Sequence, residues 1–194
     1  LQQIVLRHEV LRTTIEQNDN QEHGIQKIHN NLLSIEQVNL NTQEDYQSVI
    51  KADINHPFNL SVEYPIRVKF YTIVSDETTA DKQQNKILLL INMHHIASDG
   101  WSIEIFQKEL LAYYEAYIKG DRDFSLPTLE IQYKDYALWQ RTYLTGEILE
   151  RQLHYWKNKL AGYQTLELPT DYPRPIKMDY SGSVQTFKLS NKIS

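Results

Sequence analysis

Residues 86–93, KILLLINM, contain five consecutive aliphatic side chains, Ile87 to Ile91. An unbroken apolar run of strand length is typical of a β-strand that is covered on both faces, because a strand with one wet face alternates apolar and polar residues. A strand of this kind lies in the centre of its sheet. The chain is therefore expected to contain a sheet in which Lys86–Met93 is the central strand.

Hydrophobic periodicity and turn residues predict the remaining elements. Thr42 and Ser102 are the expected N-caps of two of the helices. No internal repeat is visible. Helices are expected over residues 1–8, 42–56, 102–120, 129–144 and 147–160, and strands over residues 10–16, 25–28, 35–40, 65–74 and 184–189.

The strand expected over residues 65–74 has a different pattern from the apolar run. Positions 66, 68 and 70 are apolar, whereas positions 67, 69 and 71 are Arg, Lys and Tyr. Successive side chains of a strand point to opposite faces of the sheet. This alternation therefore predicts one buried face and one solvated face.

The composition excludes several classes of function. The 194 residues include 20 Lys and Arg against 25 Asp and Glu, a net charge of −5, and the basic residues form no block. Because nucleic acid binding needs clustered basic residues, nucleic acid is not an expected partner. The absence of cysteine excludes disulfides, thiolate nucleophiles and Cys-ligated metals. The longest apolar run is too short to span a bilayer, so no membrane association is expected.

The segment after the apolar run, His94 to Gly100, reads HHIASDG. Neighbouring strand residues point to opposite sides, so His94 and His95 are not expected to bind one metal ion, and Asp99 adds at most a second ligand. The segment lies between a strand end and a helix N-terminus, where backbone amides favour negative charge. The residues alone leave two interpretations open: a reaction centre, or a strand end whose histidines are satisfied by hydrogen bonds.

The remaining segments indicate no chemistry by their residues alone. No dinucleotide-binding fingerprint, P-loop or G-x-S-x-G pattern is present. RHEVLRT, Arg7 to Thr13, is most simply a charged helix end. YKDYALWQ, Tyr133 to Gln140, is most simply an aromatic helix face packed in a core.

Three of these segments, in this order, resemble motifs of the condensation domain of nonribosomal peptide synthetases. RHEVLRT is similar to the family's second core motif and YKDYALWQ to its fourth. MHHIASDGWS, Met93 to Ser102, is similar to the third, the HHxxxDG motif. HPFNLSVEYPIRVKFY and LELPTDYPRP are similar to the family's connecting segments. HHxxxDG alone also occurs in other acyltransferases, but the three motifs together are specific.

The resemblance implies a chloramphenicol-acetyltransferase-like lobe. Such a lobe has an α+β fold, an α/β two-layer sandwich with a mixed central sheet and helices packed on it. Residues 1–160 are expected to form the N-terminal lobe without its start, 161–183 an extended connector, and 184–194 the start of a truncated C-terminal lobe. Because the reaction tunnel of the family runs between two lobes, this fragment alone is expected to be inactive.

The resemblance also implies roles for the residues of the third motif. His95 is expected to face the tunnel and serve the reaction, and Gly100 to permit a tight turn and leave room for a substrate arm. Asp99 is expected to pair with Arg12 and tie the motif to the first strand. His94, on the opposite side, is expected to orient or pack.

Other residues are implied to support this site. Arg7 and Trp139 are expected to be structural, with Trp139 in a core. Backbone amides near Trp101 and Ser102, at the start of the following helix, are candidates for stabilising an oxyanion or lining the tunnel.

The implied reaction is amide (peptide-bond) formation between an acyl or peptidyl thioester donor and an aminoacyl thioester acceptor. Both substrates arrive on the phosphopantetheine arms of carrier proteins, and the domain itself is expected to bind no cofactor and no metal. The expected partners are the upstream and downstream peptidyl carrier proteins and an adjacent adenylation domain, in the cytoplasm.

Two alternatives remain beside this interpretation. The chain is either part of a free-standing HHxxxDG acyltransferase that forms esters or amides, or an inactive lobe that only binds carriers. The connecting segments and YKDYALWQ argue against the first alternative. The intact HHxxxDG motif argues against the second.

Overall fold

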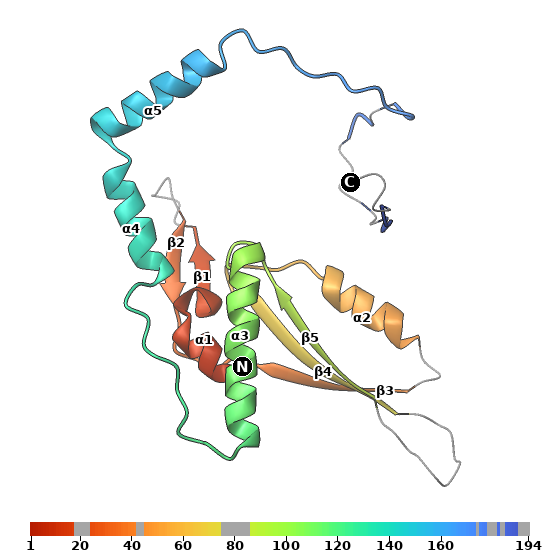
Figure 1. The fold of residues 1–194 in the computed structure, drawn as a ribbon. Helices are drawn as coiled ribbons and strands as arrows, with labels where there is room; N and C mark the ends of the chain where they lie inside the picture. The colour runs from red at the N-terminus through yellow and green to blue at the C-terminus, as the bar shows by residue number, and fades with distance from the viewer. Residues whose placement is uncertain are drawn as a thin grey trace. The chain divides into compact units, whose positions relative to one another are not determined.

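The computed structural model describes residues 1–17, 24–41, 45–74, 86–173, 175–177, 182 and 185–189. The chain divides into two compact units, Leu1–Thr145 and Gly146–Ser194. Figure 1 labels the helices and strands along the chain. Thr42, the predicted cap of the second helix, and Val184, the predicted start of the last strand, lie outside the described residues.

The strands of the first unit form two sheets. β1 (Thr13–Glu16) and β2 (Ile25–Ile28) pair antiparallel. β3 (Ile35–Asn41) pairs parallel with β4 (Ile66–Val74), which pairs antiparallel with β5 (Lys86–Met93). The three-stranded sheet is therefore mixed, as predicted, and helices pack on it, which confirms the α+β class of fold.

The central strand of this sheet is β4, because the strand order is β3-β4-β5. β5 pairs only with β4 among the described strands, and Ile87 in it is 68% exposed, so the predicted central position of β5 is wrong. The predicted wet face of β4 is also wrong. Val68 on one face of β4 and Tyr71 on the other are both almost completely buried.

A 3₁₀ helix separates the N-terminal helix from β1. α1 (Gln2–Arg7) is followed by the 3₁₀ helix η1 (Glu9–Arg12), so the strand predicted from residue 10 begins only at Thr13. The Thr13 hydroxyl donates a hydrogen bond to the Glu9 carbonyl oxygen at 2.7 Å. Leu11 is buried in the core, and the turn of η1 directs it there.

The other helices of the first unit are α2 (Tyr46–Asn55), α3 (Gly100–Ile118) and α4 (Tyr133–Tyr143). Asp45 caps α2, since its side chain accepts a hydrogen bond from the Ser48 backbone amide at 3.2 Å. These helices agree with the predicted ones to within a few residues at each end.

Two clusters of buried residues lie on the two faces of the three-stranded sheet. On one face, residues of β4 pack with α1, η1 and α3. On the other face, β3 and β4 pack against Tyr46 and Ile50 of α2. The first cluster contains Ile4, Val5, Leu11, Leu33, Ile66, Val68 and Phe106, and the second contains Leu40, Tyr71 and Ile73.

The second unit contains α5 (Gly146–Lys159). Its described residues after α5 form no helix or strand, so the strand predicted over residues 184–189 is not present at residues 185–189. Leu149, Leu153 and Trp156 lie at helical spacing on α5 and are each at least 38% exposed.

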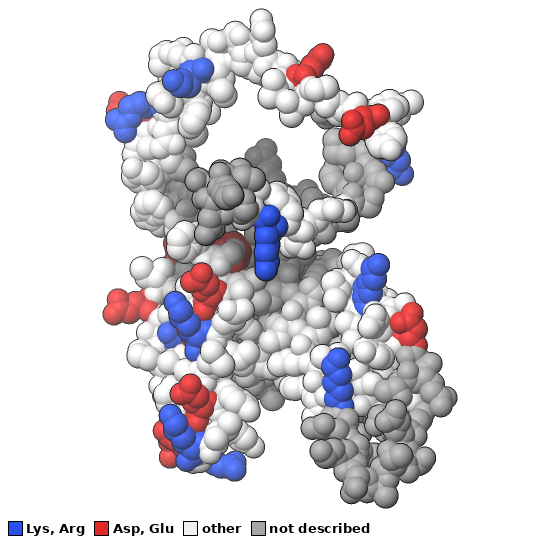
Figure 2. Space-filling model, turned by 45° about the vertical axis from the view of Figure 1, so that its right-hand side comes forward, with Lys and Arg blue, Asp and Glu red and all other residues white. Residues whose placement is uncertain are grey.

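Charged side chains of both signs share the surface of the molecule. On the face in Figure 2, Lys and Arg side chains are interspersed with Asp and Glu side chains. Lys108 on α3 and Lys119 at its C-cap each lie within 4.0 Å of a Glu one turn earlier. Among the described residues, no helix is both long and apolar enough to cross a membrane.

Candidate active site

The HHxxxDG segment forms the connection from β5 to α3. The His94 amide continues the ladder of β5 by donating to the Pro65 carbonyl oxygen at 2.9 Å. Residues 95–97 then form a turn, in which the Ala97 amide donates to the His94 carbonyl oxygen at 3.0 Å. The Ser98 hydroxyl donates to the same oxygen at 3.2 Å. The His94 backbone therefore anchors the whole turn.

The two histidines have different surroundings. The His94 ring is partly buried, and Phe58 packs against it edge-on with the ring centroids 5.7 Å apart. Its Nδ1 accepts a hydrogen bond from the Ile96 backbone amide at 3.0 Å, which leaves a proton of the neutral ring on Nε2. The His95 side chain is exposed. His95 is thus the more exposed of the two histidines.

Asp99 is the N-cap of α3 and forms a capping box with Ser102. Its Oδ1 accepts from the Ser102 amide at 2.8 Å, and the Asp99 amide donates to the Ser102 hydroxyl at 2.6 Å. Hydrogen bonds from the backbone and side chain of Ser102 lower the pKa of the Asp99 carboxyl, and the charge of His95 contributes less. Ser102 is therefore the third residue of α3, and the prediction that it caps the helix is wrong.

The predicted pair between Asp99 and Arg12 does not form. Arg12 lies in η1, is 9% exposed, and its Nη1 donates to the His29 carbonyl oxygen at 2.5 Å and to Asn30 Oδ1 at 3.1 Å. It therefore ties η1 to the turn that follows β2. Asp99 is instead used by its own helix, which is the physical reason why this prediction is wrong.

Gly100 and Trp101 open α3 at the surface. Gly100 has no positive φ, and a Cβ atom added to it would meet nothing within 4 Å. Gly100 therefore does not adopt a left-handed conformation here, and the space around it is open. The Trp101 side chain is 83% exposed. The Ser102 amide, a predicted oxyanion donor, already donates to Asp99.

Glu109, which the sequence did not single out, joins α3 to α1. It is 9% exposed, and its carboxylate lies 3.0 Å from Arg7 Nε and 2.8 Å from His8 Nε2. Arg7 therefore supports the helix that begins at the HHxxxDG motif. The sequence held one signal for this contact: Glu109 follows the apolar Phe106 by three residues, so both side chains lie on the same face of the helix.

The start of α4 is tied to the same region through Gln132. Gln132 Nε2 donates to the Arg7 carbonyl oxygen at 2.9 Å, and its Oε1 accepts from the Glu9 amide at 3.1 Å. Lys134 adds an ion pair with Glu9 at 2.6 Å. Polar side chains at the start of α4 thus connect the YKDYALWQ segment to the RHEVLRT segment.

Trp139 does not lie in a core of the described residues, contrary to the prediction. It is 53% exposed and stacks on Tyr143 at 5.0 Å, with 13° between the ring planes. The Tyr136 ring, about one turn earlier, lies 5.7 Å from the Trp139 ring. These side chains form a row along one face of α4.

A small cavity lies beneath the HHxxxDG turn. Its volume is about 130 Å³, and its walls are mostly apolar. It is lined by His8, Val10, Leu11, Met93, Ala97, Ser98, Ser102, Ile105 and Phe106. Within the described ranges, no three His, Asp or Glu side chains gather closely enough to hold a metal ion.

Comparison with known proteins places this arrangement in a family. The family model of the condensation domain matches residues 1–194. One linear gramicidin synthase component from Brevibacillus parabrevis is 41% identical over 201 residues, which span 100% of this chain and 2% of that protein. The nonribosomal peptide synthetase TES of Alternaria alternata is 35% identical over 198 residues, which span 100% of this chain and 4% of that protein.

Solved structures with the same fold agree. The X-domain in its complex with OxyB from teicoplanin biosynthesis has a TM-score of 0.70 and 28% identity, covering 89% of this chain and 36% of its own. The starter condensation domain of rhizomide synthetase RzmA has a TM-score of 0.63 and 17% identity, covering 84% of this chain and 37% of its own. This chain belongs to the condensation domain family of nonribosomal peptide synthetases.

Proposed function

We propose that this chain supplies the reacting histidine of an amide-forming condensation domain. The observation that carries the proposal is the position of His95, exposed in the turn between β5 and α3. In the proposed reaction, the amine of a carrier-bound acceptor attacks the thioester carbonyl of a carrier-bound donor. The C–N bond forms, the C–S bond breaks, and the donor's phosphopantetheine thiol leaves.

The proton inventory defines what His95 contributes. An α-amine has a pKa of about 8, so roughly a tenth of it is neutral at pH 7 and producing the nucleophile costs only ~1.4 kcal/mol. The attack then leaves a second proton on nitrogen that must depart before the amide is stable. His95 accepts this proton or positions the amine, a role worth about 10²–10⁴-fold in rate.

His95 is favoured over His94 by their contacts. His94 Nδ1 is occupied by the Ile96 amide, and protonating that nitrogen breaks the bond. The ring of His94 also packs on Phe58. His94 is therefore assigned the role of holding the turn, and Asp99 that of starting α3 behind it.

The proposed partners follow from the family and from the length of the chain. Donor and acceptor arrive on phosphopantetheine arms of peptidyl carrier proteins, with an adenylation domain in the same synthetase. The chain spans 36% and 37% of the solved domains described above, so the proposal places the activity in a longer protein and none in this chain alone.

Ester formation is a second candidate for the same site. The bassianolide nonribosomal cyclodepsipeptide synthetase of Beauveria bassiana is 39% identical over 186 residues, covering 95% of this chain and 6% of that protein, and a depsipeptide contains ester bonds. A neutral amine can attack first and lose its extra proton afterwards. A hydroxyl acceptor is a weaker nucleophile, so a base must remove its proton as the oxygen attacks.

The test uses a synthetase that carries this chain, with the donor carrier loaded with a labelled acyl group. One reaction offers an aminoacyl-loaded acceptor carrier, and a matched reaction offers the corresponding hydroxyacyl-loaded carrier. We expect label to appear on the amine-bearing carrier as an amide. Transfer only to the hydroxyl-bearing carrier would replace amide by ester formation, and transfer to neither would overturn both assignments.

A further inference from the structure

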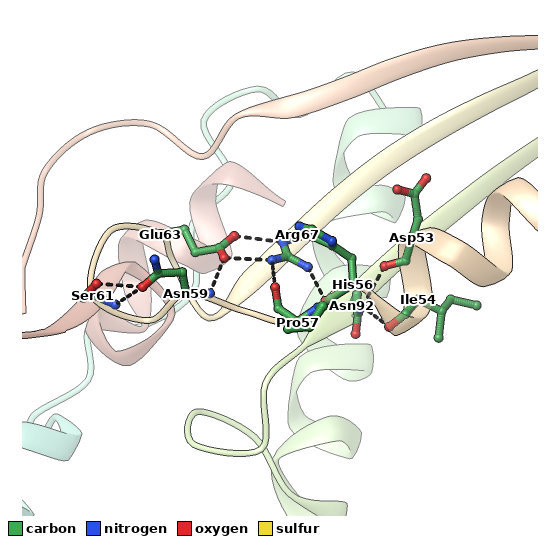
Figure 3. A network of polar contacts seen from close by, with 9 residues as sticks. All are labelled: Asp53, Ile54, His56, Pro57, Asn59, Ser61, Glu63, Arg67 and Asn92. Carbon is green, nitrogen blue, oxygen red and sulfur yellow. Dashed lines mark hydrogen bonds and ion pairs between the residues drawn. The ribbon is translucent and has the colours of Figure 1, made fainter. Parts of the chain in front are cut away.

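The loop of residues 56–64, between α2 and β4, wraps around the side chain of Arg67 (Figure 3). Arg67 Nη1 and Nη2 donate to the carbonyl oxygens of His56 and Pro57, each at 2.7 Å. Its Nε and Nη2 donate to the two oxygens of Glu63 at 2.8 and 2.7 Å. We call residues 56–64 the Arg67 loop, because one guanidinium holds both its ends.

The Arg67 loop is closed by further bonds. Glu63 Oε1 also accepts from the Asn59 amide at 2.5 Å, and the Asn59 side chain accepts from Ser61. The hydrogen bonds from Arg67 lower the pKa of the Glu63 carboxyl, although burial opposes this shift. The Arg67–Glu63 pair is bidentate and therefore fixes orientation as well as distance.

Phe58 connects the Arg67 loop to the HHxxxDG turn. The Arg67 guanidinium carbon lies 4.0 Å from the centroid of the Phe58 ring, a cation–π contact. The Phe58 and His94 rings meet edge-on, with 5.7 Å between their centroids and 83° between their planes. Phe58 therefore touches both Arg67, on β4, and His94, at the end of β5.

His94 in turn holds the backbone that follows His95. Its ring nitrogen accepts from the Ile96 amide, and its carbonyl oxygen accepts from Ala97 and Ser98. A rotation of the His94 ring breaks its bond to Ile96 and releases one side of the turn. The direction of the His95 side chain is thus coupled to the His94 ring.

We propose that Phe58 and Arg67 are positioning residues for His95, acting through the His94 ring. The proposal rests on the proposed function of His95. Arg67 orients Phe58, Phe58 fixes the ring of His94, and His94 fixes the turn from which His95 projects. Neither Phe58 nor Arg67 takes part in bond making, so their loss lowers kcat by misplacing His95 and leaves carrier binding unchanged.

The test compares Phe58→Leu with Phe58→Tyr in a synthetase that carries this chain. Leu keeps apolar bulk but removes the ring edge, whereas Tyr keeps the ring. Misplacing a reacting group by about 1 Å costs up to about 100-fold in rate, so Phe58→Leu is expected to lower kcat by about tenfold or more with KM for the loaded acceptor carrier unchanged. Phe58→Tyr is expected to keep the wild-type kcat.

A second readout does not depend on catalysis. Diethyl pyrocarbonate modifies neutral imidazoles, and fragment ions of the peptide that contains both histidines assign the modification to His94 or His95. His94 is expected to react faster in Phe58→Leu than in the wild type, because the ring loses its cover. Phe124→Leu is the matched control, since Phe124 makes the same edge-on contact with Tyr113 at 5.4 Å and 81°.

Arg67→Lys tests the proposal independently of Phe58→Leu, and so also if Phe58→Leu does not fold. Lys retains the positive charge but not the bidentate bond to Glu63, so kcat is expected to fall. Where Phe58→Leu does fold, the two losses are expected not to be additive. A wild-type kcat in Arg67→Lys, a loss in KM instead of kcat, or an equal loss in Phe124→Leu overturns the proposal. Full activity of His95→Ala overturns the proposed function instead, while the His94 modification rate still reports the coupling.

Discussion

The hydroxyl of Tyr71 donates a hydrogen bond to Asp53, with 2.5 Å between the two oxygen atoms. Tyr71 is completely buried on β4, and Asp53 lies in the last turns of α2 and also pairs with Lys69 at 2.8 Å. Burial, followed by this hydrogen bond, raises the pKa of Tyr71. The alternation in β4 predicted that this face of the strand is solvated. The contact shows that the face is instead an interface between the sheet and α2.

Removing the Tyr71 hydroxyl is expected to destabilise the fold. Tyr71→Phe keeps the ring but leaves Asp53 without one donor, and a hydrogen bond to a charged group is worth about 2 kcal/mol. Urea unfolding measures the change in the free energy of unfolding. Tyr114→Phe, at a side chain that is 60% exposed on α3, is the control and is expected to have no measurable effect. Equal values for the two variants would show that the contact is absent.

The same cluster predicts the acid dependence of stability. Burial raises the pKa of Asp53, but the hydrogen bonds from Lys69 and Tyr71 outweigh it, and the net shift is downward from 3.8. A carboxyl with a lowered pKa in the folded state stabilises the fold above its ordinary pKa, and this contribution is lost as the pH falls through the folded value. Below pH 3.8 the wild type is therefore expected to lose stability more steeply than Asp53→Asn, in urea melts at stepped pH. Parallel curves would contradict the shift.

Glu109 is expected to be the costliest carboxylate on α3 to remove. Glu109→Ala leaves Arg7 without its partner in a largely buried setting, and breaking such a pair costs about 3 kcal/mol. Glu104→Ala is the matched control, because its pair with Lys108 is exposed and worth less than about 1 kcal/mol. Chemical unfolding of both variants provides the comparison. If Glu109→Ala lowered the free energy of unfolding no more than Glu104→Ala does, the pair between Arg7 and Glu109 would not stabilise the contact between α1 and α3.

Arg12 and Asp99 are expected to act independently. Their contacts share no partner, so Arg12→Met and Asp99→Asn should change the free energy of unfolding additively, to within about 0.5 kcal/mol. Arg7→Met with Glu109→Ala is the positive control, and that cycle should show a larger coupling energy. A coupling of the same size between Arg12 and Asp99 would restore the pair that the family resemblance implied.

The sequence predicted the strands better than their positions in the sheet. β2 and β5 have the predicted bounds, because apolar and β-branched residues between turn residues are local signals. The order of the strands is not local. Lys69 made β4 look half solvated, although Asp53 and Glu36 satisfy its charge. An ion pair of this kind leaves no trace in the spacing of one strand.

The candidate site shows the same division. The segment HHIASDG was correctly placed at the junction of a strand and a helix, because the run of aliphatics ends before it and apolar residues at helical spacing follow it. The capping residue was predicted as Ser102 but is Asp99. The partners of its side chains were not predictable in that way. Asp99 can cap a helix or pair with Arg12, and only the backbone of Gly100 to Ser102 decides between these. Glu109 was missed because its partners lie about a hundred residues away in the sequence.

The rate of a single condensation turnover tests the central claim most directly. A synthetase that carries this chain, with both carriers loaded, is compared as wild type, as His95→Ala and as His154→Ala, a control at an exposed position of α5. His95→Ala is expected to slow amide formation by about 10²–10⁴-fold, and His154→Ala to leave it unchanged. A wild-type rate for His95→Ala would contradict the assignment of His95 as the reacting histidine.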